Sequence, residues 1–130
     1  MKNEVLVFDT NVLLRYFLKD IESQYLKVAK IIKGIENKKT LGKLSVLVVA
    51  ETIWVFESVY KLDREVVIRE LLKVIALKNI EIIEINKATL IEILGVMIYK
   101  RFDFVDVYLS KIASKNEIFS FDKDFQKLYK

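Results

Sequence analysis

Four acidic residues border apolar segments, where an unpaired carboxylate is costly. They are Asp9, Glu51, Asp106 and Asp122. Asp9 and Asp122 directly end the apolar runs 5–8 and 117–121, and Glu51 follows the run 44–49 after one alanine. Carboxylates that gather without a histidine or arginine repel one another unless a cation lies between them, and a set of oxygen ligands favours Mg²⁺ or Mn²⁺. The chemistry that these residues would supply is therefore that of a hard metal ion.

Each of these acids also has an ordinary structural explanation. Asp9, Glu51 and Asp122 would lie at or near helix N-termini, where free backbone N–H groups and the helix dipole favour acidic side chains. In the helix expected over residues 103–115, Asp106 falls at the edge of the apolar face and can also bond back in a weak capping box. Asp103 is better explained as the N-cap of that helix. From the residues alone, metal binding and helix capping both remain open.

The composition excludes several kinds of chemistry. The 130 residues contain no cysteine, so disulfides, thiolate catalysis and zinc–cysteine sites are impossible. They contain no histidine either, which removes the commonest general base and the commonest transition-metal ligand. Catalysis would have to depend on carboxylates, lysine, tyrosine, hydroxyl groups or a hard metal ion.

Charge and hydropathy predict a soluble protein with a mild preference for polyanions. Lysine and arginine number 22 against 18 acidic residues, which gives a formal net charge of +4. The first residues lead directly into an apolar run, without the longer apolar core of a signal peptide. No apolar stretch reaches the roughly 20 residues that a membrane span requires. We therefore expect a cytoplasmic protein.

A single α/β domain over residues 1–130 would position the acids. Short apolar runs predict strands, and apolar residues at helical spacing predict helices between them, one of which is capped by Asp63. The expected strands cover residues 5–8, 44–49, 80–85 and 117–121, and the first should be buried on both faces. Strands that alternate with helices indicate a parallel sheet with right-handed crossovers. In such a sheet, Asp9, Glu51 and Asp122 would share the carboxyl edge, where ligands bind.

Each acid also lies in a short motif. The four motifs read VFDTNVLL from residue 7, VAETIWV from 49, FVDVYL from 104 and SFDKDF from 120. Together and in this order they resemble the PIN-domain nucleases, and within them the VapC-type toxins of toxin–antitoxin pairs. The resemblance covers the whole chain.

The resemblance implies a three-layer α/β/α fold. Its parallel sheet would have four strands, or five if a further strand forms, surrounded by about seven helices. The resemblance also assigns functions to seven side chains. The catalytic and metal-binding carboxylates would be Asp9, Glu51, Asp106 and Asp122, and the supporting residues would be Asn11, Ser120 and Asp124. Ser120 has an alternative as an ordinary hydroxyl that bonds locally.

By this resemblance the protein would be a metal-dependent endoribonuclease. Mg²⁺ or Mn²⁺ on the carboxylates would contact the scissile phosphate of single-stranded or looped RNA, activate a water and stabilise the leaving oxygen. Arg15, Lys100 and Arg101 are candidate phosphate contacts, unless they are ordinary surface charges. The resemblance also suggests a cognate antitoxin that blocks the site, and a homodimer, which the apolar helix around Trp54 would suit.

Two other functions stay open. A non-catalytic RNA-binding or assembly module could use the same fold, although the complete set of carboxylates argues against it. A phosphoacceptor domain that resembles the receiver domains would need a second acidic residue beside Asp9 and a lysine after a late strand. Thr10 and Asn11 follow Asp9 instead, and the late apolar run ends on Asp122.

Overall fold

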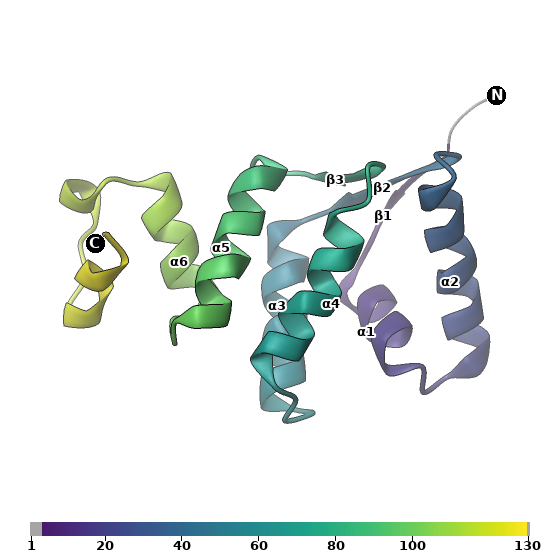
Figure 1. Cartoon of the computed structure of the whole chain (residues 1–130), viewed down its shortest axis with the longest axis horizontal. Helices are drawn as coiled ribbons and strands as arrows, with labels where there is room; N and C mark the ends of the chain where they lie inside the picture. The colour runs from purple at the N-terminus through teal and green to yellow at the C-terminus, as the bar shows by residue number, and fades with distance from the viewer. Residues whose placement is uncertain (1–3, 130) are drawn as a thin grey trace. The chain divides into compact units, whose positions relative to one another are not determined.

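This computed structural model describes residues 4–129, in which three short strands separated by pairs of helices are followed by helices alone (Figure 1). Two compact units divide the chain, Met1–Lys87 and Ala88–Lys130. The first unit contains β1 (Glu4–Val7), α1 (Thr10–Leu18), α2 (Glu22–Glu36), β2 (Thr40–Leu44), α3 (Val46–Ser58), α4 (Arg64–Ile75) and β3 (Ile80–Ile82). The second contains α5 (Lys87–Tyr99), which begins at the boundary, α6 (Phe104–Ile112) and the 3₁₀ helices η1 (Lys115–Glu117) and η2 (Lys123–Tyr129). That the whole chain forms one domain stays a prediction.

The sheet is parallel, as predicted, but within residues 4–129 it has three strands and not four. Its order is β1-β2-β3, with Val5 opposite Leu41 and Lys43 opposite Glu81. The predicted strand over residues 117–121 is absent, because its first residue ends η1 and the others pair with no strand. The aromatic side chains of this segment are therefore exposed and do not form one face of a sheet.

The second strand lies earlier than predicted. β2 covers Thr40–Leu44, and the apolar run 44–49 belongs mostly to α3. A continuous apolar run suits a buried helix as well as a strand, which explains the error. The true strand was obscured by Gly42, yet this glycine is required for packing. A Cβ atom on Gly42 would lie 2.7 Å from Cδ1 of Ile80 and 2.9 Å from Cδ1 of Ile35.

The first strand is not buried on both faces, which corrects a second expectation. Val5 and Val7 are 53% and 66% exposed, whereas Phe8, just after the strand, is 3% exposed. β1 lies at one end of the sheet order, so it has a neighbouring strand on one side alone within the described residues. Because alternate residues of a strand point to opposite faces, one face of β1 is left open.

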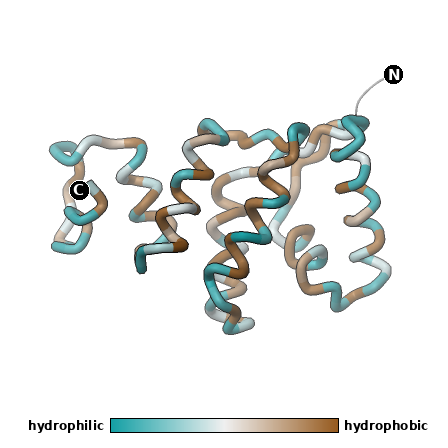
Figure 2. The backbone as a smooth tube through the Cα atoms, in the orientation of Figure 1, coloured by the Kyte–Doolittle hydropathy of each residue, from teal (hydrophilic) through white to brown (hydrophobic). Residues whose placement is uncertain are grey.

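The helices of the first unit pack on the sheet and on each other. α2 contacts β2 and α4 contacts β3, while α1 contacts α2 and α3, and α3 contacts α4. In Figure 2, hydrophilic and hydrophobic segments alternate along α4, because its buried residues recur at helical spacing. They are Val67, Ile68, Leu71, Val74 and Ile75. Asp63 caps this helix as predicted, since its Oδ1 accepts from the backbone N–H of Glu65 at 2.9 Å.

Three lysines follow the ends of α1, α2 and α3 in the left-handed region of backbone conformation. They are Lys19, Lys38 and Lys61, with φ values of 55°, 62° and 56°. This region favours glycine, because other residues bring Cβ close to the backbone. The chain thus ends each of these helices without using a glycine.

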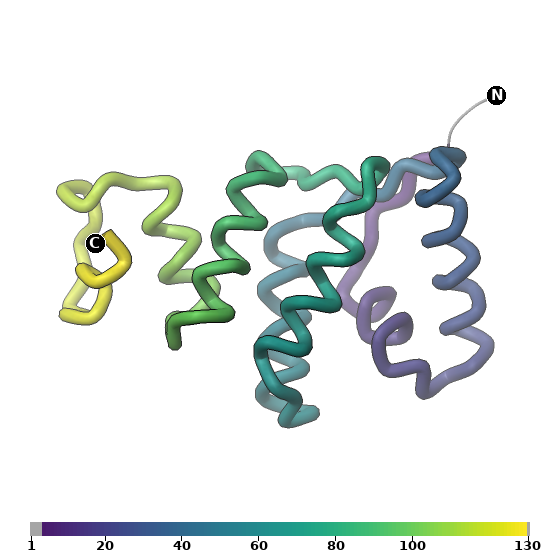
Figure 3. Tube along the Cα trace, viewed as in Figure 1, coloured from purple at the N-terminus to yellow at the C-terminus, as the bar shows by residue number. Residues whose placement is uncertain are grey.

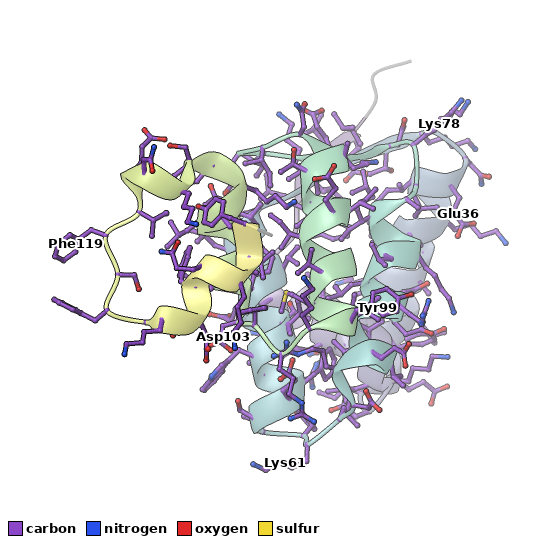
Figure 4. The ribbon with its side chains drawn as sticks, turned by 60° about the vertical axis from the view of Figure 1, so that its left-hand side comes forward. Glu36, Lys61, Lys78, Tyr99, Asp103 and Phe119 are labelled. Atoms are coloured by element: carbon purple, nitrogen blue, oxygen red, sulfur yellow. The ribbon has the colours of Figure 1, made fainter. Side chains whose placement is uncertain are left out.

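The second unit is less regular. Figure 3 shows the chain passing from α6 through η1 and then back to η2, and α6 and η2 are in contact. The hydroxyl of Tyr129 donates to the carbonyl oxygen of Ala113 at 3.0 Å, and Phe125 is buried. In the connecting segment, Phe119 points away from the ribbon (Figure 4).

Among residues 4–129, none of the helices is both long enough and apolar enough to cross a membrane.

Candidate active site

Asp9 lies between β1 and α1, as the sequence predicts. Its backbone is extended, with φ −96° and ψ 174°, and its Oδ1 accepts from the backbone N–H of Val12 at 3.1 Å. Asp9 is therefore the N-cap of α1, which confirms the structural explanation. The capping hydrogen bond occupies only Oδ1. Because the side chain is exposed, Oδ2 remains available for a ligand.

The two other candidate residues of α1 differ in their surroundings. Asn11 is exposed in the first turn. Arg15, a candidate phosphate contact, is mostly buried, and its Nη1 lies 3.1 Å from Oδ2 of Asp20. Its Nε is buried without a hydrogen-bond partner among residues 4–129. The ion pair with Asp20 indicates that Arg15 holds the end of α1, which favours a structural role over phosphate binding.

Glu51 does not follow a strand, because the predicted strand over residues 44–49 is wrong. It lies in the second turn of α3, exposed, and five residues after the first helical residue, Val46. The N-cap of α3 is Ser45, whose Oγ accepts from the backbone N–H of Leu47 at 3.1 Å. Glu51 is therefore not a helix cap, and its position is set by where α3 begins.

In the second unit, a cavity of about 300 Å³ brings acidic residues together. It is lined by Arg101, Phe102, Asp103, Asp106, Asp122, Asp124 and Lys127. Asp106 lies in the first turn of α6 and is partly buried. Burial raises the pKa of Asp106, and the negative charges of Asp103 and Asp122 raise it further. This carboxylate is thus held where its charged form is disfavoured, which is common at functional sites.

Asp122 enters this cavity from a turn and not from the predicted strand. Its Oδ1 accepts from the backbone N–H of Asp124 at 2.9 Å, and its own N–H donates to Oγ of Ser120 at 3.0 Å. Ser120 thus supports the turn that presents Asp122. Asp124 forms an ion pair with Lys127, with Oδ1 and Nζ 2.9 Å apart.

Sequence reasoning missed two charged residues of the cavity. Asp103 occupies the N-cap position of α6 but makes no side-chain capping hydrogen bond. Its spacing of three residues from Asp106 could have shown that both share one side of the helix. Lys127 gave no comparable signal, because a lysine near a chain end resembles ordinary surface charge. Among the candidate cations, Arg101 lines the cavity and Lys100 does not.

The acidic side chains that line this cavity are possible ligands for a hard cation. Over residues 4–129, no group of three or more acidic side chains is arranged to hold a metal ion. The available side-chain donors are nevertheless carboxylate oxygens, which suit Mg²⁺ or Mn²⁺. Burial, and then the negative charges of Asp103 and Asp122, raise the pKa of Asp106, and a cation would offset the part of this shift that comes from the charges.

Comparison with known proteins identifies the family. No curated protein and no solved structure shows significant similarity to the chain. The family model described as PIN domain, however, matches residues 6–130 and so covers both units. PIN domains are generally nucleases, which are hydrolases that act on nucleic acid, and they typically use divalent metal ions. The parallel sheet and its surrounding helices fit this fold, and the chain belongs to the PIN-domain family.

Proposed function

We propose that this protein is a metal-dependent endoribonuclease of the VapC toxin type. It hydrolyses RNA phosphodiester bonds, and Asp9, Glu51, Asp106 and Asp122 are its catalytic and metal-binding carboxylates. The observation that carries the proposal is the shared cavity of Asp106 and Asp122, in which burial and neighbouring acids raise the pKa of Asp106. The family match supports the nuclease activity. The four-motif resemblance supports the toxin type.

Each residue of the proposed site has its own role. Bound Mg²⁺ or Mn²⁺ would supply a Lewis acid for the phosphate and would lower the pKa of a coordinated water. Asp9 offers Oδ2 while Oδ1 caps α1. Ser120 holds the turn of Asp122 in place. Asp124 and its partner Lys127 line the same cavity, where the ammonium group places a positive charge near the bound phosphate. Asn11 supports the site from the first turn of α1.

We also propose two protein partners, an antitoxin that blocks the site and a second copy in a homodimer. α3 suits such contacts, because Leu47 and Trp54 are 74% and 63% exposed. A contiguous patch of exposed apolar side chains marks an interaction surface. A cytoplasmic location stays a prediction.

The proposal is tested by RNA cleavage with purified protein. The assay compares wild type with Asp9→Asn and Asp106→Asn on single-stranded RNA, in Mg²⁺, in Mn²⁺ and in EDTA. Glu92→Gln is the matched control, since this exposed glutamate pairs with Lys111 outside the cavity. We expect cleavage that needs the metal, is lost in both aspartate variants and persists in the control. Equal cleavage by all four proteins, or cleavage in EDTA, would contradict the proposal and favour a non-catalytic RNA-binding module.

A further inference from the structure

Glu84 is an acidic residue that the proposed catalytic set does not use. It lies two residues after β3, at the same carboxyl edge of the sheet where Asp9 follows β1 and Ser45 follows β2. Its carboxylate accepts two hydrogen bonds from the start of α3. One comes from the hydroxyl of Ser45, and the other comes from the backbone N–H of Val46 to Oε1 at 2.9 Å.

With Glu84 in place, the backbone N–H groups of residues 46–49 all have hydrogen-bond acceptors. The first four N–H groups of a helix have no partner within the helix. Here Val46 donates to Glu84 and Leu47 donates to Oγ of Ser45. Val48 and Val49 both donate to the carbonyl oxygen of Ser45, at 3.1 and 3.2 Å. Glu84 is thus the one partner that comes from a distant part of the chain, and it joins the end of β3 to the start of α3.

We propose that Glu84 is a positioning residue that fixes the start of α3 and thereby the placement of Glu51. This inference rests on the proposed function of Glu51 as a metal ligand. Glu51 lies five residues beyond Val46, which is about 7.5 Å along a helix axis. A tilt of about 10° at the start of α3 would therefore move Glu51 by roughly 1 Å, and displacements of this size are costly at reacting groups.

An alternative role for Glu84 would be direct metal binding, and the hydrogen bonds argue against it. Ser45 and Val46 already occupy its carboxylate, and anionic acceptors are favoured at a helix N-terminus. The two roles differ in what a glutamine would do. Glutamine keeps a carbonyl oxygen that accepts from the N–H of Val46. Its amide N–H can donate to the Ser45 hydroxyl oxygen, so this second hydrogen bond is kept with its direction reversed. Glutamine would therefore replace a positioning residue but not an anionic ligand.

The experiment measures Mn²⁺ affinity and RNA cleavage for wild type, Glu84→Ala and Glu84→Gln. The matched control is Glu81→Ala, which removes an exposed glutamate three residues earlier on β3. We expect Glu84→Ala to weaken Mn²⁺ binding about tenfold, the size typical of groups that orient a metal ligand. Its kcat should fall while the KM for RNA stays unchanged. Glu84→Gln and Glu81→Ala should remain within about twofold of wild type. Amide hydrogen exchange at Val46 should be faster in Glu84→Ala alone.

Each outcome has a definite meaning. Wild-type Mn²⁺ affinity in Glu84→Ala overturns the positioning role. Equal losses in Glu84→Gln and Glu84→Ala overturn it too, and identify Glu84 as a ligand. If wild type itself neither binds Mn²⁺ nor cleaves RNA, the proposed function fails and the metal-related part of this inference fails with it. The amide hydrogen-exchange rate of Val46 still shows in that case whether Glu84 fixes the start of α3.

Discussion

The proposed carboxylates of the two units are held in different ways. In the first unit, Asp9 and Glu51 are exposed on or beside regular helices, and Asp9 gains a hydrogen bond by capping α1. In the second unit, Asp106 and Asp122 share a cavity with further aspartates, and burial together with the charges of Asp103 and Asp122 disfavours the charged form of Asp106. A capping carboxylate stabilises the fold, whereas a crowded one opposes it. The carboxylates of the proposed site are therefore expected to lower the stability of the second unit and not that of the first.

The largest expected effect separates the two functions of Asp9. Asparagine caps helices as well as aspartate does, so Asp9→Asn should fold with wild-type stability yet lose roughly 100-fold or more of the cleavage rate. Asp9→Ala should lose the same activity and about 1 kcal/mol of stability as well. RNA cleavage and urea unfolding measure the two effects. Full activity in Asp9→Asn would reduce Asp9 to a helix cap.

The packing of the first unit is tested at Gly42. Gly42→Ala should destabilise the fold by about 1 to 3 kcal/mol, because the new methyl group would overlap the side chains of Ile35 and Ile80, which are each 1% exposed. The midpoint of urea unfolding, followed by circular dichroism, gives the free energy. An unchanged midpoint would mean that the isoleucines can move aside at little cost.

The electrostatic cost in the second unit is tested with Asp106→Asn in EDTA. The pKa of Asp106 is raised above the ordinary 3.8 in the folded protein, so between these two values the folded state binds more protons than the unfolded state. The contribution of Asp106 to stability is thus fully present below pH 3.8 and is lost as the pH rises through the raised pKa. Asparagine lacks this dependence.

We therefore expect the urea midpoint of Asp106→Asn to exceed that of wild type at neutral pH, and the difference to vanish in acid. Adding Mn²⁺ at neutral pH should then stabilise wild type but not the variant, because the ion binds the folded carboxylates. Midpoints measured over a pH series, with and without metal, check both expectations. Identical midpoints at neutral pH would show that neither burial nor the neighbouring charges make the ionised form of Asp106 destabilising.

The smallest effect is expected at Gly95, the counterpart of Gly42 in the second unit. Gly95 lies inside α5, and a Cβ atom there would meet no atom within 4 Å. Gly95→Ala should therefore stabilise the protein by about 0.5 to 1 kcal/mol, since alanine favours a helix interior. Thermal unfolding provides the measurement. A destabilised variant would indicate a neighbour that packs against this glycine in solution.

Side chains that act within their own segment could be predicted from the sequence. Asp9 and Asp63 cap helices as expected, because capping depends on residues two or three positions away. The strand boundaries could not be predicted as well. β2 contains Gly42 because Ile35 of α2 and Ile80 of β3 leave no room for a side chain, and neither belongs to the strand itself. The residues next to Gly42 in the sequence do not reveal these neighbours.

The candidate site shows the same division. The motifs indicated Asp106 and Asp122, and the structure places both in one cavity. The motifs left out Asp103, although its spacing from Asp106 could have indicated it. They did not indicate Lys127 either, because its place in the cavity depends on how η2 returns to α6. The role of Glu84 was hidden for the same reason, since its partners Ser45 and Val46 lie 39 and 38 residues away.

The lysines that end three helices have a consequence for how the protein meets other molecules. A glycine at Lys19, Lys38 or Lys61 would relieve the left-handed backbone, but it would also remove a cation from near the negative end of a helix. Replacing all three lysines by glycine would lower the formal net charge of the chain from +4 to +1. The protein therefore accepts some backbone strain and keeps a positive net charge, which would attract a nucleic acid at long range and speed its first encounter.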